Sequence, residues 1–141
     1  MALTTIECKG VVKGKVAGKV LFSRKPLSFI GGVDPETGII QDPLSDQYGQ
    51  SMADKILVFP FGKGSSGAGL VLLELARVGK APKALVNLRT NTVLLTGPLV
   101  MREFYKKEMP VVCVNEAGME ILSQAGEATV DSTAGEITLT A

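Results

Sequence analysis

The chain has 141 residues, 45% of them hydrophobic and 21% charged, which suffices for one buried core and is too short for two ordinary domains. Its 15 Lys and Arg residues against 14 Asp and Glu residues give a net charge of +1, which predicts no basic surface for nucleic acid. The absence of His excludes His-based catalysis, His metal ligands and phosphohistidine carriers. We therefore expect one globular domain over residues 1–141 that binds no nucleic acid.

The first third of the chain predicts strands and then a long loop. Residues 11–22 alternate partly between apolar and polar, which predicts a strand pair or one interrupted strand, with a turn or bulge at Gly14 or Gly18. Residues 23–54 are rich in Gly and Pro and predict no regular element. Because a compact domain seldom carries so long a structureless loop without a purpose, this loop is a candidate functional segment.

The middle of the chain predicts a β–α–β unit, because two short apolar runs flank a segment with helical spacing. Strands joined in this way pair in parallel. We expect the helix to bury Leu70, Leu73, Leu75 and Ala76 and to end at Gly79 as its C′ residue. In chain order the unit consists of a buried strand at 55–60, a glycine-rich turn at 61–67, a helix at 68–78 and a strand at 84–87.

The last third repeats this pattern less regularly. Asn115 is a plausible N-cap and Gly126 a plausible stop for its second helix. The fold class is therefore one α/β domain with β-rich ends around a central strand–Gly turn–helix–strand unit. The expected elements are a strand at 92–95, a helix at 99–107, a strand at 111–114, a helix at 116–124 and a closing hairpin of residues 127–131 and 136–139.

The two cysteines and the lengths of the apolar segments indicate in which compartment of the cell the protein is expected. The sequence has no apolar run near the ~18 residues that a membrane span needs, and its first residues lack the layout of a signal peptide. Cys8 and Cys113 have neither a CxxC spacing nor a His to complete a metal site. We expect reduced thiols, with Cys113 buried, in a cytoplasmic protein without a membrane contact, although the sequence leaves a disulfide open.

The glycine-rich turn, Gly62-Lys63-Gly64-Ser65-Ser66-Gly67, matches G-x-G-x-x-G between a strand and a helix, which is the context of a dinucleotide-binding motif. The acidic residue expected about 20 residues later is replaced by Asn87 and Leu88. A Walker A motif fails as well, because Gly64 and not Ser or Thr follows Lys63. The turn is therefore not expected to bind a nucleotide.

Ser65 and Ser66 precede a helix, where backbone N–H groups are unpaired and the helix dipole is positive. Such a position binds a carboxylate or phosphate. It also stabilises a negatively charged serine oxygen, so that a Ser can act as base or nucleophile without His. A simpler interpretation makes Ser66 the N-cap and Ser65 a turn residue. The sequence leaves both interpretations open.

The loop segment 26–38, PLSFIGGVDPETG, has the composition of a series of turns. Phe29 and Ile30, directly before Gly31 and Gly32, are nevertheless unusually apolar for a surface loop. We expect this pair to pack against a partner, or the glycines to bring the backbone close to a ligand.

Together with three further motifs, segment 26–38 closely resembles the small subunit, or swivel domain, of the aconitase X family. The resemblance runs from about Gly10 to Val114 and implies the swivelling β/β/α fold that also forms the mobile domain of aconitases. The further motifs are GKGSS at 62–66, LLEL at 72–75 and GKAP at 79–82.

The resemblance implies a hydro-lyase that dehydrates a small hydroxy acid, of the cis-3-hydroxyproline or 5-phosphomevalonate type. It implies Ser65 as proton acceptor and a large catalytic subunit that holds an iron–sulfur cluster or iron. We expect this chain to bind no cofactor itself and to be inactive alone. Dehydration needs both a base and a Lewis acid, and these residues offer only the first. The candidate substrate-binding residues are Lys63, Gly64, Ser66, Gly32 and Asp34.

The sequence also departs from the family pattern. Segment 41–46, QDPLSD, replaces a basic or His-Pro-Leu element, and an acid there argues against strong phosphate binding if it touches substrate. Phe61 stands where a smaller or polar residue is expected, and the start of the helix after Gly67 is nearer the bacterial hydroxyproline branch. The alternative function is a non-catalytic swivel module that binds a small anion or a partner protein, in which Lys63 is only a solvated side chain.

Overall fold

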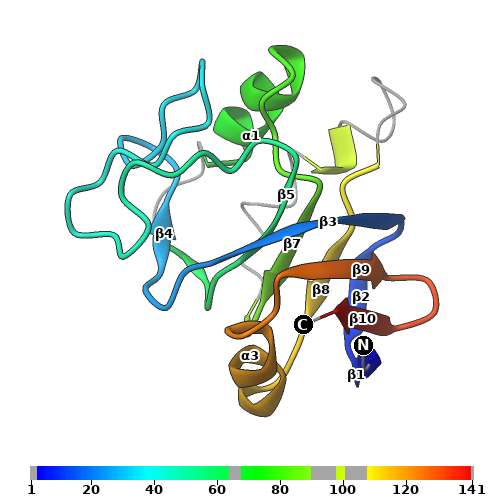
Figure 1. The fold of residues 1–141 in the computed structure, drawn as a ribbon. Coiled ribbons are helices and arrows are strands. Elements are labelled where there is room, and N and C mark those ends of the chain that lie inside the picture. Colours follow the sequence, from blue (N-terminus) through cyan, green and yellow to red (C-terminus); the bar gives the residue numbers. More distant parts are fainter. Residues whose placement is uncertain (1–2, 64–67, 90–97, 101–107, 141) are drawn as a thin grey trace.

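The computed structural model describes residues 3–63, 68–89, 98–100 and 108–140. Their main element is an eight-stranded sheet with the strand order β1-β10-β9-β3-β5-β7-β8-β2 (Figure 1). The four central strands β3, β5, β7 and β8 are parallel, and the pairs at either side are antiparallel. The strands are β1 (Leu3–Glu7), β2 (Lys9–Val12), β3 (Lys15–Phe22), β5 (Lys55–Val58), β7 (Ala84–Asn87), β8 (Val111–Cys113), β9 (Glu127–Asp131) and β10 (Glu136–Thr140).

The sheet curls around itself, because β1 and β2 occupy its two ends in the strand order yet follow one another in the chain. Two hydrogen bonds hold the ends together. The Cys8 N–H donates to the Gly135 carbonyl at 2.9 Å, and the Ser132 hydroxyl donates to the Val12 carbonyl at 2.6 Å. The β9–β10 hairpin consequently lies over the central strands (Figure 1). The sequence predicted this hairpin but no element at residues 3–7, which form β1.

The curled sheet has two hydrophobic clusters, one on each face. Ile56, Val58 and Val86 point toward the β9–β10 hairpin and helix α3 (Glu116–Leu122). Leu57 and Leu85, from the alternate positions of the same strands, point toward helix α1 (Ala68–Arg77) and the loop 23–54. Strands buried on both faces read as continuous apolar runs. The result is a layer of helix and loop, a central sheet and a second β layer, which confirms the predicted α/β fold of the swivelling β/β/α type.

The loop 23–54 is part of this core. Phe29, expected on the surface, is fully buried, and its ring meets Phe59 edge to face with centroids 5.8 Å apart. Ile40 and Met52 are fully buried as well. The expectation of an exposed Phe29–Ile30 pair is therefore wrong for Phe29, while Ile30 is 49% exposed. Because α1 covers only part of the sheet, apolar residues of the loop cover the rest.

Helix α1 begins and ends where the sequence predicts. Gly79 has a φ of 77°, its N–H donates to Ala76, and the Lys80 N–H donates to Leu75, which is a Schellman motif. Its buried face differs from the prediction, because Leu72, Leu75 and Ala76 are buried whereas Leu70 is 63% exposed. The spacing of three and four residues along a helix selects Leu72 over Leu70.

Helix α3 is shorter than predicted. Asn115 is its N-cap, and the side chain accepts a hydrogen bond from the Gly118 N–H at 2.8 Å. The helix ends at Leu122 with Ser123 as its C-cap, so Gly126 does not terminate it. The carbonyl of Gly126 instead accepts a hydrogen bond from Val20 at 3.0 Å, at the junction with β9.

The remaining predictions have separate outcomes. Residues 11–22 contain parts of two strands, β2 and β3, separated at Gly14 as predicted, but these strands do not pair with one another, because β2 pairs with β8 and β3 with β5 and β9. Residues 98–100 are helical, whereas the predicted strand 92–95 and the rest of the predicted helix 99–107 lie outside the described residues. Cys113 is only half-buried, which corrects the expectation of a buried thiol, and neither cysteine forms a disulfide. Among the described residues, no helix has the length and apolarity needed to cross a membrane.

Candidate functional site

The four parallel strands β3, β5, β7 and β8 end at one edge of the sheet, here called the carboxyl edge. In open parallel sheets, ligands bind outside this edge. The strand pairing continues for one residue beyond the strands. Ser23 donates to the Val58 carbonyl at 2.8 Å, Phe59 to Val86 at 3.0 Å, and Val114 to Asn87 at 2.8 Å. The segments that follow the strands are therefore fixed where they leave the sheet.

A small second sheet joins the two segments that carried the family resemblance. Strand β4 (Leu27–Ser28) pairs in parallel with β6 (Gly62–Lys63), so Leu27 lies opposite Gly62 and Ser28 opposite Lys63. The Leu27 N–H also donates to the Phe61 carbonyl at 3.3 Å. Because β6 leads directly into Gly64 and Ser65, this pairing places the loop 26–38 beside the start of the glycine-rich turn.

Gly32 and Asp34 both shape the loop next to β4. A Cβ on Gly32 would lie 2.1 Å from the Ser28 carbonyl oxygen, so only glycine fits there. The Gly32 backbone thus makes a close approach to Ser28, the partner of Lys63, while the predicted approach to a ligand stays a prediction. The Asp34 carboxylate accepts a hydrogen bond from the Glu36 N–H at 2.9 Å and closes a turn. The structure brings Gly32 to the β4–β6 pair, and the binding roles of both residues stay predictions.

The other predicted site residues lie at or beyond the end of β6. Gly64, Ser65 and Ser66 lie outside the described residues, and for Lys63 only the backbone is described, as part of β6. Helix α1 begins at Ala68, three residues after Ser65 in the chain. The catalytic role of Ser65 and the binding roles of the other three residues therefore stay predictions.

Asn87, at the end of β7, connects that strand to the segment before β6. Its side chain is fully buried, and Nδ2 donates to the Phe59 carbonyl at 3.0 Å. The Oδ1 atom is buried and has no hydrogen-bond partner among the described residues, an arrangement that costs about 1–3 kcal/mol. The sequence marked this position only as lacking the acid of a dinucleotide site. Its role in holding the β5–β6 connection became visible only in the structure.

Arg89 and Phe61 form a contact that the sequence did not reveal. The guanidinium carbon of Arg89 lies 4.6 Å from the centroid of the Phe61 ring, which is a cation–π contact. The backbone N–H groups of Leu88 and Arg89 both donate to the Pro60 carbonyl, at 3.0 and 3.2 Å. Phe61, unexpected at this position in the family pattern, thus stacks against the positively charged Arg89 side chain at the carboxyl edge. A basic residue two positions after a buried parallel strand was the available sequence signal.

The acids of segment 41–46 have structural partners. Asp42 accepts a hydrogen bond from the Leu44 N–H at 2.9 Å, and Asp46 accepts from the Arg24 N–H at 2.9 Å and the Ser23 hydroxyl at 3.1 Å. Partial burial acts to raise the pKa of Asp46, but these hydrogen bonds outweigh it and lower the pKa below its ordinary value of 3.8. The Asp46 carboxylate therefore fixes the loop to the end of β3, and the Asp42 carboxylate closes a turn within the loop.

Residues 5–139 match the model of the aconitase X swivel domain. The chain belongs to this family. The swivel-domain match includes nearly all of the curled sheet, helices α1 and α3 and the β4–β6 pair, and it extends into the closing hairpin.

Individual members of the family agree along almost the whole chain. The phosphomevalonate dehydratase small subunit of Thermococcus kodakarensis is 43% identical over 127 residues, which is 90% of either chain. The protein of the same name from Methanococcoides burtonii is 34% identical over 140 residues, 99% of this chain and 98% of that one. A crystal structure of the holo-form of aconitase X from Thermococcus kodakaraensis has a TM-score of 0.84 at 39% identity and covers 98% of this chain and 99% of that chain.

The residues of this swivel domain do not fit an iron centre. The sequence has no His and only two Cys, and the described residues contain no group of three His, Cys, Asp or Glu side chains that could hold a metal ion. Burial, and next the charge of Asp131, raise the pKa of the Cys8 thiol to about 11. A thiol with this pKa stays protonated at neutral pH and is neither a ready ligand nor a nucleophile.

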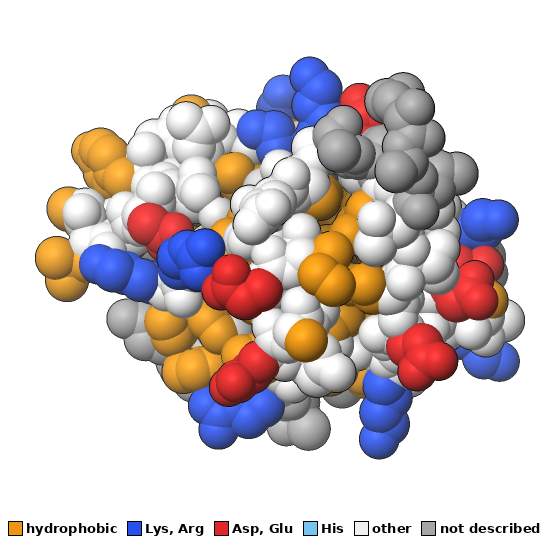
Figure 2. Space-filling view, turned by 60° about the horizontal axis from the view of Figure 1, so that its bottom comes forward, with side chains coloured by type: hydrophobic (Ala, Val, Ile, Leu, Met, Phe, Trp, Pro, Cys, Tyr) orange, Lys and Arg blue, Asp and Glu red, His pale blue; other side chains and the backbone are white. Residues whose placement is uncertain are grey.

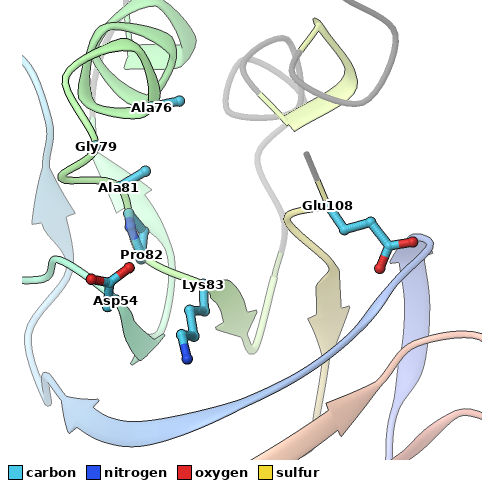
Figure 3. A pocket seen from close by; sticks show the side chains of 7 residues that line it. All are labelled: Asp54, Ala76, Gly79, Ala81, Pro82, Lys83 and Glu108. Carbon is cyan, nitrogen blue, oxygen red and sulfur yellow. The ribbon is translucent and has the colours of Figure 1, made fainter. Parts of the chain in front are cut away.

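A cavity of about 140 Å³ lies at the opposite, amino edge of the parallel strands (Figure 3). Asp54, Lys83 and Glu108 line it, together with residues of the family motif at 79–82. Lys83 extends toward β3, where its Nζ donates to the Ala17 carbonyl at 2.9 Å. Glu108 lies on the other side of the cavity and points away from Asp54 (Figure 3). These charged groups do not converge on one point, which argues against a catalytic site there.

A second hollow, of about 270 Å³, lies at the carboxyl edge next to α3. Pro60, Leu88 and Met119 supply apolar lining, and an ion pair of 3.0 Å between Arg24 and Glu120 lies at the same place. Figure 2 shows this face with acidic and basic side chains interspersed around apolar patches. The charges on this face are thus largely balanced.

Proposed function

We propose that this chain is the small subunit of a two-chain dehydratase that acts on a small hydroxy acid, with Ser65 as the proton acceptor. The observation that carries the proposal is the parallel pairing of β4 with β6, because it joins two segments of the family pattern at the residue before Gly64. The names of the relatives support the reaction, since the proteins 43% and 34% identical to this chain are small subunits of phosphomevalonate dehydratases.

The substrate that we propose is 5-phosphomevalonate, with cis-3-hydroxyproline as the alternative. The relatives favour the phosphorylated acid, whereas the helix start after Gly67 favoured hydroxyproline. Segment 41–46 no longer argues against a phosphate, because Asp42 and Asp46 are occupied by hydrogen bonds of the loop. A carboxylate that is neutralised by backbone donors repels a nearby anion less than a free one does.

The chemistry assigned to this chain is proton transfer. Dehydration removes a hydroxyl group from one carbon and a proton from its neighbour, and a serine accepts that proton only as its alkoxide. Ser65 lies three residues before Ala68, the first residue of α1. The unpaired N–H groups and the dipole at a helix start stabilise negative charge, which lowers the cost of the alkoxide. Gly64, Ser66 and Lys63 are proposed to bind the substrate beside it.

The iron–sulfur cluster or iron expected of the family is proposed to belong to the large subunit, because the residues of this chain do not fit it. We further propose that the large subunit covers the side of the molecule with the β4–β6 pair. Ile30, two residues after β4, is an exposed apolar side chain there. Cys8 and Cys113 form no disulfide, which agrees with the cytoplasmic location that we propose.

The test is co-expression of this chain with an aconitase X large subunit, followed by purification through a tag on one chain. The complex is incubated with 5-phosphomevalonate and with cis-3-hydroxyproline, and the dehydrated product is measured by mass spectrometry. We expect a stable complex that dehydrates the phosphorylated acid, and no turnover by the small subunit alone. A complex that binds a small anion but dehydrates neither compound would favour the non-catalytic swivel module instead.

A further inference from the structure

Arg89 is held in a fixed position at the carboxyl edge. It lies two residues after the end of β7, and its N–H shares the Pro60 carbonyl with that of Leu88, at 3.2 and 3.0 Å. The segment that it contacts, residues 59–61, leads into β6. An arginine attached in this way loses less conformational entropy on binding a ligand than one on a free loop.

The aromatic ring of Phe61 fixes the other end of the side chain. The guanidinium carbon is 4.6 Å from the ring centroid, and stacking on an aromatic face leaves the N–H donors at the edge of the guanidinium available. Phe61 is itself held by its neighbours, because Asn87 binds the Phe59 carbonyl at 3.0 Å and the Phe59 ring packs against Phe29. The guanidinium is thus oriented before any ligand arrives.

The charge of Arg89 is not neutralised within the described part of the chain. No described carboxylate oxygen lies within 4.0 Å of its guanidinium. Arg24 provides a contrast, because it also lies over an aromatic ring, Phe22 at 5.4 Å, but donates to Glu120 at 3.0 Å. Of these two stacked arginines, only Arg89 keeps its forked donor edge for an external anion.

We propose that Arg89, oriented by Phe61, binds an oxyanion of the substrate, the phosphate or the carboxylate, and positions the substrate at the carboxyl edge. This inference rests on the proposed dehydratase function. A guanidinium pairs with either group through two parallel N–H···O bonds. Because a bound phosphate does not change its charge during dehydration, Arg89 on the phosphate contributes mainly to substrate binding and little to the chemical step.

The test uses the reconstituted two-chain complex with the variants R89A, R89K and F61L, and R24A as the matched control. For R89A we expect KM to rise roughly ten- to a hundredfold with kcat within a few-fold of wild type, as for the loss of a charged bidentate contact. R89K retains the charge but lacks the paired N–H donors of the guanidinium, so we expect a smaller rise in KM than for R89A. F61L raises KM by about two- to fivefold, since a stacking partner is lost. R24A leaves both constants near wild type.

Inhibition by simple anions identifies the substrate group that Arg89 binds. If it binds the phosphate, inorganic phosphate competes with substrate in the wild type and about tenfold less well in R89A, whereas acetate inhibits both alike. If Arg89 binds the carboxylate, acetate competes with substrate in the wild type and about tenfold less well in R89A, whereas inorganic phosphate inhibits both alike. A wild-type complex that turns over while R89A keeps the wild-type KM and the same inhibition by both anions overturns the role of Arg89 alone. A wild-type complex without dehydratase turnover overturns the proposed function and this inference together.

Discussion

The two edges of the parallel strands differ in how their charged groups are engaged. At the amino edge, Lys83 donates to the Ala17 carbonyl and Glu108 accepts from the Lys15 N–H, although a cavity of about 140 Å³ lies between them. At the carboxyl edge, Arg89 lies on an aromatic ring without a described acid, and the buried Oδ1 of Asn87 accepts no hydrogen bond from a described residue. Both edges have a hollow, and unused hydrogen-bonding capacity among the described residues distinguishes the edge next to the glycine-rich turn.

The largest expected effect is on kcat, which a substitution at the carboxyl edge should lower and one at the amino edge should not. In the reconstituted complex, Ser65→Ala removes the proposed base, and we expect kcat to fall by roughly 10²- to 10⁴-fold. Lys83→Met, at the amino edge, serves as the control and is expected to stay within about twofold of wild type, since it touches no proposed site residue. Turnover of Ser65→Ala within a few-fold of wild type would remove the catalytic role of this serine.

The second prediction concerns the backbone that supports the carboxyl edge. Gly32→Ala places a methyl group where the Ser28 carbonyl lies 2.1 Å away, so β4 must shift from β6. We expect a loss of about 2–3 kcal/mol in the free energy of unfolding, measured by urea denaturation, together with weaker substrate binding. Gly31→Ala is the matched control, because its φ of 78° is strained but no atom lies within 4 Å, and it is expected to cost only about 1 kcal/mol.

The third prediction compares a buried hydrogen bond with an exposed one. Asn87→Ala leaves the buried Phe59 carbonyl without its donor and is expected to lower the free energy of unfolding by about 1–3 kcal/mol. Lys83→Met removes a hydrogen bond of similar length, 2.9 Å, from an exposed site. It is expected to cost less than about 1 kcal/mol. Equal losses in urea denaturation would show that the Asn87 contact is not a structural clamp.

The fourth prediction concerns the partner. Ile30 is 49% exposed beside the carboxyl edge, and Ile121 is 41% exposed on α3. We expect Ile30→Ser to weaken the affinity for the large subunit about tenfold, because an apolar contact at the centre of an interface contributes more than one outside it. The matched variant Ile121→Ser is expected to bind as the wild type does. Titration calorimetry measures both, and the reverse order would place the large subunit on the α3 side.

The smallest effect depends on pH. The hydrogen bonds to Asp46 lower its pKa below 3.8 in the folded state. The carboxylate therefore stabilises the fold above about pH 4, and this contribution is lost as the pH falls through the lower folded pKa. Because Asp46 is exposed, we expect no more than about 0.5 kcal/mol. Denaturation midpoints of wild type and Asp46→Asn should converge at acid pH, and a constant difference between pH 3 and 7 would contradict the assignment.

The elements that the sequence predicted well are those with local causes. The continuous apolar runs predicted β5, β7 and β8, which are buried on both faces of the sheet. The caps Asn115 and Gly79 predicted helix ends, because they form hydrogen bonds within one turn of the helix. The predictions that failed depended on distant neighbours. Phe29 is buried because the Phe59 ring lies beneath it, and Leu70 is exposed although its type favours burial.

The sequence by itself determined the family, the β–α–β centre and the glycine-rich turn with Ser65, because these are patterns of adjacent residues. Because it lacks His and a set of metal ligands, the sequence also predicted that a second chain holds the iron. Only the tertiary structure decided which segments meet. The pairing of Ser28 with Lys63 and the stacking of Arg89 on Phe61 join residues far apart in the chain. Such contacts arise because the sheet brings the ends of several strands to one edge, which no local pattern encodes.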